Sequence, residues 1–374
     1  FQSNQMPLLV EAYTHRRTSI ETAPFNPEIV LVQNHGMGQW LKLELAQHQG
    51  IAANISAELP GTYITGLYHQ FLRTPVEKES AYSRNILTWH IMDVLNSTGT
   101  ANKKSNAFLP LNNYLDGEGD RDLRLYQLSH QLAGLYEQYL IYRPAWIHAW
   151  DKGAPGPLIC QQHPWQALLW QEIIRRTDER HRANLHLELL GIIDSINPTE
   201  LPARVPLFGF SSLPPMHFDT FRALAEKVEV DIYFLNPCQH YWGDIVSSKD
   251  IARRSVRDLI EQTSDAALAD EDYMDIGNPL LSSMGKQGRE YFELLLSEES
   301  LDDATHFAPS APNTILSLLK NDVLNLEFGG SFGAGAQPEK LPHAANDTSI
   351  RIHSCHSKSR EVEVLLDQIY QRCS

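Results

Sequence analysis

The first part of the chain alternates between strand-like and helix-like spacing of its apolar residues. Met6–Tyr13 predicts a helix, and Ile29–Gln33, whose first four residues are all apolar, predicts a buried strand. Met37–Gln47 has apolar residues at helical spacing, and Gly50 is placed to end that helix in a left-handed conformation. An extended stretch leads to residues 59–62, which predict a turn or the start of a helix. The alternation predicts α/β structure.

The next 125 or so residues carry a helical period almost throughout. Apolar positions between Leu125 and Tyr139 predict one long helix, which Arg143-Pro144 stops, because proline cannot continue a helix and restricts the residue before it. Further helices are marked by Ile86, Leu87, Trp89, Ile91, Val94, Leu95, Trp165, Leu168, Leu169, Ile173, Leu185, Leu189 and Ile192. Since α/β segments lie on both sides, we expect an inserted all-helical domain.

The α/β pattern then returns. Val205–Phe210 predicts a strand, Pro215–Lys227 a helix and Val228–Leu235 a second strand. A strand, a helix and a strand in this order imply a parallel pair joined by a right-handed crossover. Near the end of the chain, Ser349–His353 predicts a fresh strand and Ser359–Gln371 a fresh amphipathic helix.

These patterns predict an α/β protein with a parallel-sheet core and an inserted helical domain. The glycine-rich run at residues 329–338 is the clearest linker. The expected domains are residues 1–75 and 201–327 for the two parts of the core, 76–200 for the helical insertion, 328–348 for the linker and 349–374 for the start of a second, truncated α/β domain.

Composition narrows the class of protein. The 374 residues exceed what one hydrophobic core usually organises, and the net charge of −15 disfavours a binder coated with basic residues. There is no signal peptide and no apolar run approaching the ~20 residues of a membrane helix. The four cysteines are widely spread, so we expect a cytoplasmic protein without disulfides or membrane. The chain starts without Met and stops within a helical pattern, and we interpret it as a fragment.

The junction at residues 33–39 joins the predicted strand to a helix, the place where ligands gather in open α/β sheets. A P-loop here would require Gly-Lys-Ser/Thr at the helix start to hold a triphosphate and Mg²⁺, and the chain has none. A nucleotide-binding scaffold is therefore predicted without its ATPase chemistry. The polar residues Gln33, Asn34, His35 and Gln39 could read base edges or phosphates, or could be ordinary turn and capping residues.

The predicted strand Val205–Phe210 also lacks catalytic residues at its end. Gly209–Ser212 resembles a nucleophile elbow, but Leu213 stands where the second glycine would be. In a helicase-like core this strand would carry the Asp-Glu box, and residues 208–210 are Phe, Gly and Phe. These side chains can neither coordinate Mg²⁺ nor activate water.

The sequence contains no group of residues with the spacing typical of a metal site. Cys160 with His163, Cys238 with His240, and His353 with Cys355 and His356 lack the paired spacing of a zinc site. The acidic group Asp270, Glu271, Asp272 and Asp275 lacks the pattern of a calcium loop, which favours a solvated loop. Lys286 and Arg289 could contact phosphate or form an inter-domain ion pair. We expect no metal and no cofactor.

Several segments together resemble one family, the RecC gamma subunits of exodeoxyribonuclease V. The resemblance rests on Leu31–Leu41, Gly50–Ile55, Gln138–Pro144, His181–Asn184, Gly209–Pro215, Asn236–Pro237, Tyr241–Asp244, Gly277–Leu281, Gly285–Lys286, His353–Ser357 and Arg360–Glu363. It implies a degenerate superfamily 1 helicase-like (P-loop NTPase-like) fold. It also implies a non-catalytic subunit that assembles with RecB-like and RecD-like subunits, where the catalytic activities reside.

The resemblance further implies binding of forked duplex DNA, a channel for the 3′-ended single strand, and recognition of the Chi element in double-strand break repair by homologous recombination. By motif position the recognition residues are Gln33, His35, Gln39, Leu59, Thr65, Leu135, Glu137, Arg143 and Arg182. His35, Thr65 and Gly134 depart from the best-known member, which has Thr, Trp and an acid there, so the recognised sequence is expected to differ. The alternatives are a purely architectural subunit that binds no DNA, and an NTPase of unusual motif.

Overall fold

The computed structural model divides the chain into two compact units, Arg16–Tyr233 and Phe1–His15 with Phe234–Ser374. The structure describes residues 1–18, 27–74, 80–101, 106–177, 180–245, 277–298, 304–327 and 346–373. The predicted linker at residues 329–338 and the acidic residues 270–275 lie outside these ranges. No helix in the described part combines the length and the apolar character that crossing a bilayer requires.

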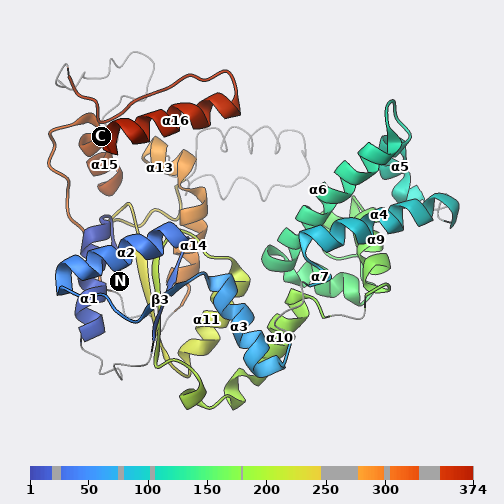
Figure 1. Ribbon diagram of the computed structural model, residues 1–374, viewed down its shortest axis with the longest axis horizontal. Helices are drawn as coiled ribbons and strands as arrows, with labels where there is room; N and C mark the ends of the chain where they lie inside the picture. The colour runs from blue at the N-terminus through green and yellow to red at the C-terminus, as the bar shows by residue number, and fades with distance from the viewer. Residues whose placement is uncertain are drawn as a thin grey trace, which may run out of the picture. The chain divides into compact units, whose positions relative to one another are not determined.

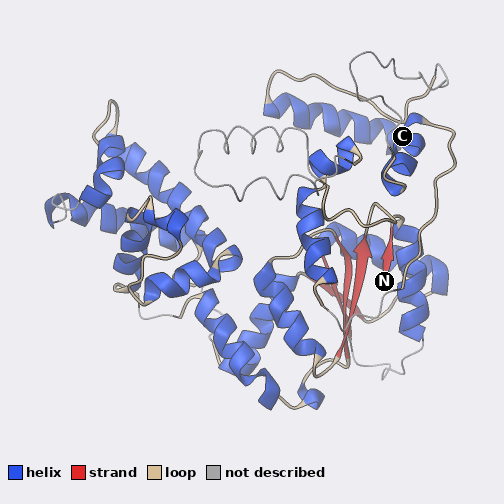
Figure 2. Ribbon diagram, turned by 180° about the vertical axis from the view of Figure 1, so that it is seen from behind, coloured by secondary structure: helices blue, strands red, loops and turns tan. Residues whose placement is uncertain are grey.

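The strands of the described residues form one five-stranded sheet in the order β1-β5-β4-β2-β3, and its arrows in Figure 2 run side by side. The strands are β1 (Gln2–Ser3), β2 (Glu28–Val32), β3 (Ile55–Glu58), β4 (Arg204–Phe210) and β5 (Glu229–Leu235). β2 pairs in parallel with both β3 and β4, and β1 pairs in parallel with β5. The α/β class and the parallel pairing are confirmed. Val30, Leu31 and Val32 are fully buried, as the apolar run in the sequence predicts.

Three helices follow the strands of the larger unit. They are α2 (His35–Gln49), α3 (Pro60–Leu72) and α11 (Pro215–Ala225). The side chain of Asn34 caps α2 by accepting a hydrogen bond from the Met37 amide at 2.9 Å. Gly50 ends α2 at φ 81°, which confirms the predicted left-handed cap.

Gly38 lets α2 approach the sheet closely. A Cβ at this position would lie 2.6 Å from the Cβ of Ala57 in β3, closer than two carbons can approach. We expect Gly38→Ala to lower the free energy of unfolding by about 1–3 kcal/mol, because overpacking outweighs the better helix propensity of alanine. Gly66→Ala in α3 is the control, since a Cβ there meets nothing within 4 Å. Denaturant titration should show Gly66→Ala neutral or stabilising, and equal effects of the two changes would contradict the argument.

The helices between β3 and β4 form a separate hydrophobic core within the larger unit, and Figure 1 shows α4, α5, α6, α7 and α9 gathered together. They are α4 (Arg84–Ala101), α5 (Leu109–Leu115), α6 (Arg121–Tyr142), α7 (Pro144–Asp151), α8 (Leu158–Gln161), α9 (Trp165–Ile174) and α10 (Arg182–Ile192). Tyr136, Trp150 and Trp170 are fully buried at its centre, with the Tyr136 and Trp170 rings 5.4 Å apart. The predicted all-helical segment and the stop at Pro144 are both confirmed.

In the described ranges, the smaller unit contains α1 (Met6–Thr18) up to residue 15, and four helices from the second half of the chain. These are α13 (Pro279–Met284), α14 (Lys286–Leu296), α15 (Ile315–Leu324) and α16 (Lys358–Cys373). Phe292 of α14 stacks on Trp242 with ring centroids 5.5 Å apart and also packs on Phe234 of β5. These aromatic contacts hold α14 on the end of β5.

The strand predicted at Ser349–His353 is wrong. The chain has no strand there, and Ile352 is 92% exposed. An alternating apolar pattern becomes a strand only when a neighbour supplies hydrogen bonds and a surface to pack on, and none is provided in the described ranges. The following helix is confirmed as α16, although Val362, Leu365 and Ile369 on its apolar face are exposed.

Candidate nucleic-acid interface

Four of the predicted site residues lie at the carboxyl edge of the sheet. Gln33 directly follows β2, and His35 and Gln39 lie in the first turns of α2; all three are exposed. Leu59 directly follows β3 and is the N-cap residue of α3. Because Leu31 of β2 is in register with Glu58 of β3, Gln33 and Leu59 leave the sheet at the same edge. The structure therefore brings these four residues to one region.

Thr65 lies one turn into α3 and is half-buried. Its hydroxyl donates to the Gly61 carbonyl at 2.7 Å, so that donor is already used within the helix. Helix α3 contacts both β2 and α10, as the adjacent α3 and α10 in Figure 1 illustrate. Thr65 is thus on the element that links the sheet edge to the start of α10.

Leu135, Glu137 and Arg143 come from the C-terminal part of α6. Leu135 and Glu137 are half-buried, whereas Arg143, between α6 and α7, is exposed. The Arg143 guanidinium donates to the Tyr142 carbonyl at 2.9 Å and lies 5.7 Å from the centre of the Trp146 ring. This orients the guanidinium without neutralising it, since no carboxylate in the described ranges pairs with Arg143.

Arg182 is the first residue of α10 and is half-buried. No hydrogen bond or ion pair links its side chain to any other described residue. Its charge acts on two neighbours: it lowers the pKa of His217, which burial has already lowered, to about 4. It also opposes the burial that raises the pKa of Tyr68 to about 12. A half-buried cation without a carboxylate partner favours an anionic ligand.

One buried hydrogen-bond network connects the elements that carry these two arginines. The carboxylate of Asp151, the last residue of α7, accepts from Trp170 Nε1 at 2.9 Å and lies 2.9 Å from His181 Nε2. His181 is the N-cap of α10, and its Nδ1 accepts from the Asn184 amide at 3.3 Å. Burial would raise the pKa of Asp151, but the hydrogen bonds from His181 and Trp170 lower it overall.

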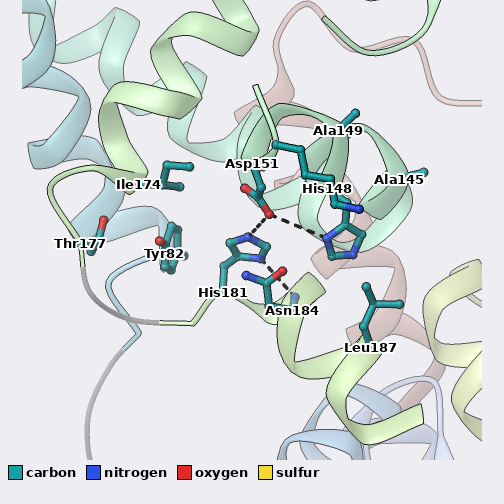
Figure 3. Close-up of a pocket in the computed structure, with 11 residues that line it drawn as sticks. Tyr82, Ala145, His148, Ala149, Asp151, Ile174, Thr177, His181, Asn184 and Leu187 are labelled. Atoms are coloured by element: carbon teal, nitrogen blue, oxygen red, sulfur yellow. Dashed lines mark hydrogen bonds and ion pairs between the residues drawn. The ribbon is translucent and has the colours of Figure 1, made fainter. Parts of the chain in front are cut away.

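A cavity of about 820 Å³ lies beside this network, with the residues converging on it shown in Figure 3. His148 Nδ1 lies 3.8 Å from the Asp151 carboxylate, and burial lowers the pKa of His148 although Asp151 acts in the opposite direction. Polar groups that line the cavity include Thr177 and Asn184. Across the described ranges, no three His, Cys, Asp or Glu side chains are grouped so that they could hold a metal ion.

The Cys and His pairs of the sequence lie in ordinary protein surroundings. Cys160 is buried, and burial raises the pKa of its thiol. Cys238 is also buried; its thiol donates to the Leu324 carbonyl at 3.4 Å and its sulfur accepts from the His240 amide at 3.3 Å. A protonated, buried thiol is a poor metal ligand or nucleophile.

Sequence reasoning missed Asp151, His181 and His217. His181 stands directly before a predicted helix, but histidine is not a common N-cap residue, so the pattern carried little signal. Asp151 ends a short helix, 30 positions before its partner. Only the packing of α7 against α10 brings the two side chains together.

The comparisons with known proteins define the class to which this architecture belongs. A family model described as "RecC, N-terminal domain" matches residues 1–326, so the chain belongs to the RecC family. The resemblance found in the sequence is thereby confirmed.

Relatives of the chain carry the name "RecBCD enzyme subunit RecC". The protein of that name from Escherichia coli (strain K12) is 35% identical over 371 residues, which cover 92% of this chain and 32% of that protein. The one from Haemophilus influenzae (strain ATCC 51907 / DSM 11121 / KW20 / Rd) is 32% identical over 92% of this chain and 34% of that protein. The one from Mycolicibacterium smegmatis (strain ATCC 700084 / mc(2)155) is 28% identical over 91% of this chain and 28% of that protein. The chain thus spans roughly a third of its relatives' length.

Proposed function

We propose that this chain is the strand-inspecting part of a RecC-type subunit in a helicase-nuclease. It contacts the 3′-ended single strand that a RecB-like motor produces from forked duplex DNA, and it takes part in recognising a Chi element. It has no catalytic activity of its own, and it works in a complex with RecB-like and RecD-like subunits.

The observation that carries this proposal is the pair of arginines without a carboxylate partner. Arg182 begins α10, which contacts α3, α6 and α7, and Arg143 lies between α6 and α7. Leu59 and Thr65 belong to the start of α3, and Leu135 and Glu137 belong to α6. The guanidinium group of arginine can donate two hydrogen bonds at once, to phosphate oxygens or to the O6 and N7 atoms of guanine. The exposed amides of Gln33 and Gln39 add donors and acceptors suited to base edges.

The junction between β2 and α2 supports a core that does not hydrolyse ATP, as a degenerate helicase-like core would. Two residues, Gln33 and Asn34, separate the strand from the helix. A P-loop needs a longer glycine-rich turn that wraps a phosphate and ends in Gly-Lys-Ser/Thr. Moreover, Gly38 is occupied in helix-to-sheet packing against Ala57. The scaffold places a helix N-terminus at the sheet edge but has no group to grip a triphosphate.

The test is Arg182→Ala in the full-length subunit, reconstituted with its partners. The complex acts on linear duplexes carrying a short randomised window, and sequencing of the protected products gives its sequence discrimination. We expect Arg182→Ala to lower this discrimination about 10- to 100-fold, because one bidentate arginine contributes ~1–3 kcal/mol, while unwinding continues.

Arg175→Ala is the matched control. Arg175 is an exposed arginine at the end of α9 that pairs with Glu172 at 2.6 Å, so its loss removes the same charge from the same unit. Discrimination should remain at the wild-type level in this variant. The proposal fails if Arg182→Ala discriminates as well as the wild type.

A purely architectural role is the second candidate, favoured by the net charge of −15. Such a subunit would bind partners without touching DNA. A single strand with photoreactive bases, bound to the whole complex, separates the two functions: crosslinks to residues 33–39 support strand inspection, and crosslinks confined to partner subunits support the architectural role.

A further inference from the structure

We infer that the Asp151–His181 hydrogen bond positions the two arginines, by fixing Arg182, the first residue of α10, relative to Arg143, the N-cap residue of α7. This inference rests on the proposed function, since it assigns a task to residues that touch no DNA themselves. Asp151 and His181 are positioning residues that act through Arg182 and Arg143.

The two nitrogens of His181 have separate tasks. Nδ1 accepts the Asn184 amide and thereby caps α10, so in the neutral ring the proton is on Nε2. Nε2 then donates to the Asp151 carboxylate at 2.9 Å. One imidazole therefore joins the N-terminus of α10 to the C-terminus of α7.

The ring cannot easily turn away from this arrangement. His181 is 2% exposed and is held edge-on between Tyr82 and Trp170, with ring centroids 5.4 and 5.5 Å away. The second oxygen of Asp151 is fixed by Trp170, which is fully buried in the helical core. The connection thus extends from the packed core to the helix end that carries Arg182.

At the N-terminal end of α7, the backbone of Arg143 is held by the helix itself. Helix α7 begins at Pro144, immediately after Arg143, and its residues Ile147 and Trp150 are fully buried. The Arg143 carbonyl accepts from the Trp146 amide at 2.9 Å, so the arginine backbone is part of the first turn of α7. Any shift of α7 against α10 changes the separation of the two guanidinium groups.

Two substitutions separate the cap from the link. In His181→Asn the short amide can replace Nδ1 and cap α10, but it cannot reach Asp151. In His181→Gln the longer amide can replace Nε2 and donate to Asp151, but it does not cap. We expect His181→Asn to lose about tenfold in sequence discrimination and His181→Gln to retain it. A merely structural cap would give the opposite order.

The measurement is the randomised-window assay on the reconstituted complex, with the unwinding rate as the check on folding and assembly. Asp151→Ala cuts the same link from the other side and should match His181→Asn. Thr88→Val is the control, because it removes a buried hydrogen bond of α4, from Thr88 to the Arg84 carbonyl at 2.7 Å, and should leave discrimination unchanged.

The outcomes distinguish this inference from the proposed function. If Arg182→Ala is silent, the proposed function is wrong. If Arg182→Ala loses discrimination while His181→Asn and Asp151→Ala keep it, only the positioning role is wrong. When His181→Asn is combined with Arg143→Ala and Arg182→Ala together, we expect no further loss; an additional tenfold loss would mean that His181 acts independently of the two arginines.

Discussion

Replacing Arg204 by methionine is expected to lower the free energy of unfolding by about 3–5 kcal/mol. Arg204 is the first residue of β4, and its side chain is 8% exposed. It donates to Glu28 of β2 at 2.9 Å and lies 3.8 Å from the carboxylate of Asp231 in β5. Without Arg204, two largely buried carboxylates would lose the cation that lies between them, and removing one partner of a buried charge network is strongly destabilising.

The neighbouring arginines do not replace Arg204. Arg17 also pairs with Glu28, and Arg16 pairs with Glu229 and approaches Asp231, but both belong to α1 and already make these contacts in the wild type. Burial already raises the pKa of Asp231, against the lowering effect of Arg204 and Arg16. Loss of Arg204 raises this pKa further, so the deficit should shrink on acidification, when the carboxylate takes up a proton.

Urea denaturation at pH 7 and at pH 5 measures both effects. The control is Arg176→Met, which removes an arginine paired with the exposed Asp93 and should cost at most about 1 kcal/mol. A cost below 1 kcal/mol for Arg204→Met would show that the network at the amino ends of the strands is dispensable.

The second large effect concerns His217 in the first turn of α11. Its pKa is lowered to about 4 by burial, with smaller contributions from Arg182 and His186, whereas in the unfolded chain it titrates near ~6.5. Between these values the unfolded chain binds a proton that the folded chain does not. Stability is therefore complete above pH ~6.5 and falls as the pH drops towards 4, by about 3 kcal/mol in total.

His217→Gln removes this titration, so its stability should fall less steeply between pH 7 and 4.5. Part of the slope remains, because burial also lowers the pKa of His186. His163→Gln, at an exposed position, should leave the wild-type profile unchanged. A His217→Gln profile parallel to the wild type would contradict this assignment.

His217 also reports on Arg182. Since the guanidinium is one cause of the lowered pKa, Arg182→Ala should move the pKa of His217 towards its ordinary value. A phosphate bound to Arg182 would act in the same direction by neutralising the charge. NMR titration of His217 thus detects anion binding at Arg182 independently of the recognition assay.

The elements that could be predicted from the sequence are those fixed by nearby residues. Gly50 ends α2 and Pro144 separates α6 from α7 because backbone sterics act within a few residues. The missing Gly-Lys-Ser/Thr after β2 is likewise a property of one short segment. The strand expected at Ser349–His353 failed for the complementary reason: a strand depends on a neighbour that local pattern does not supply.

The same distinction applies to the candidate site: some of its features follow from the sequence pattern, and others depend on contacts between distant residues. The clustering of Gln33 and Leu59 follows from parallel strands ending at one edge, which the α/β pattern implies. The Asp151–His181 link and the Arg204–Glu28 pair join residues 30 and 176 positions apart. By itself, the sequence determined the α/β class, the all-helical segment and the absence of Gly-Lys-Ser/Thr after β2, because local sterics, periodicity and residue identity encode them. Only the tertiary structure decided which charges are buried together and how the two arginines are held, because burial and hydrogen bonding depend on which helices and strands pack side by side.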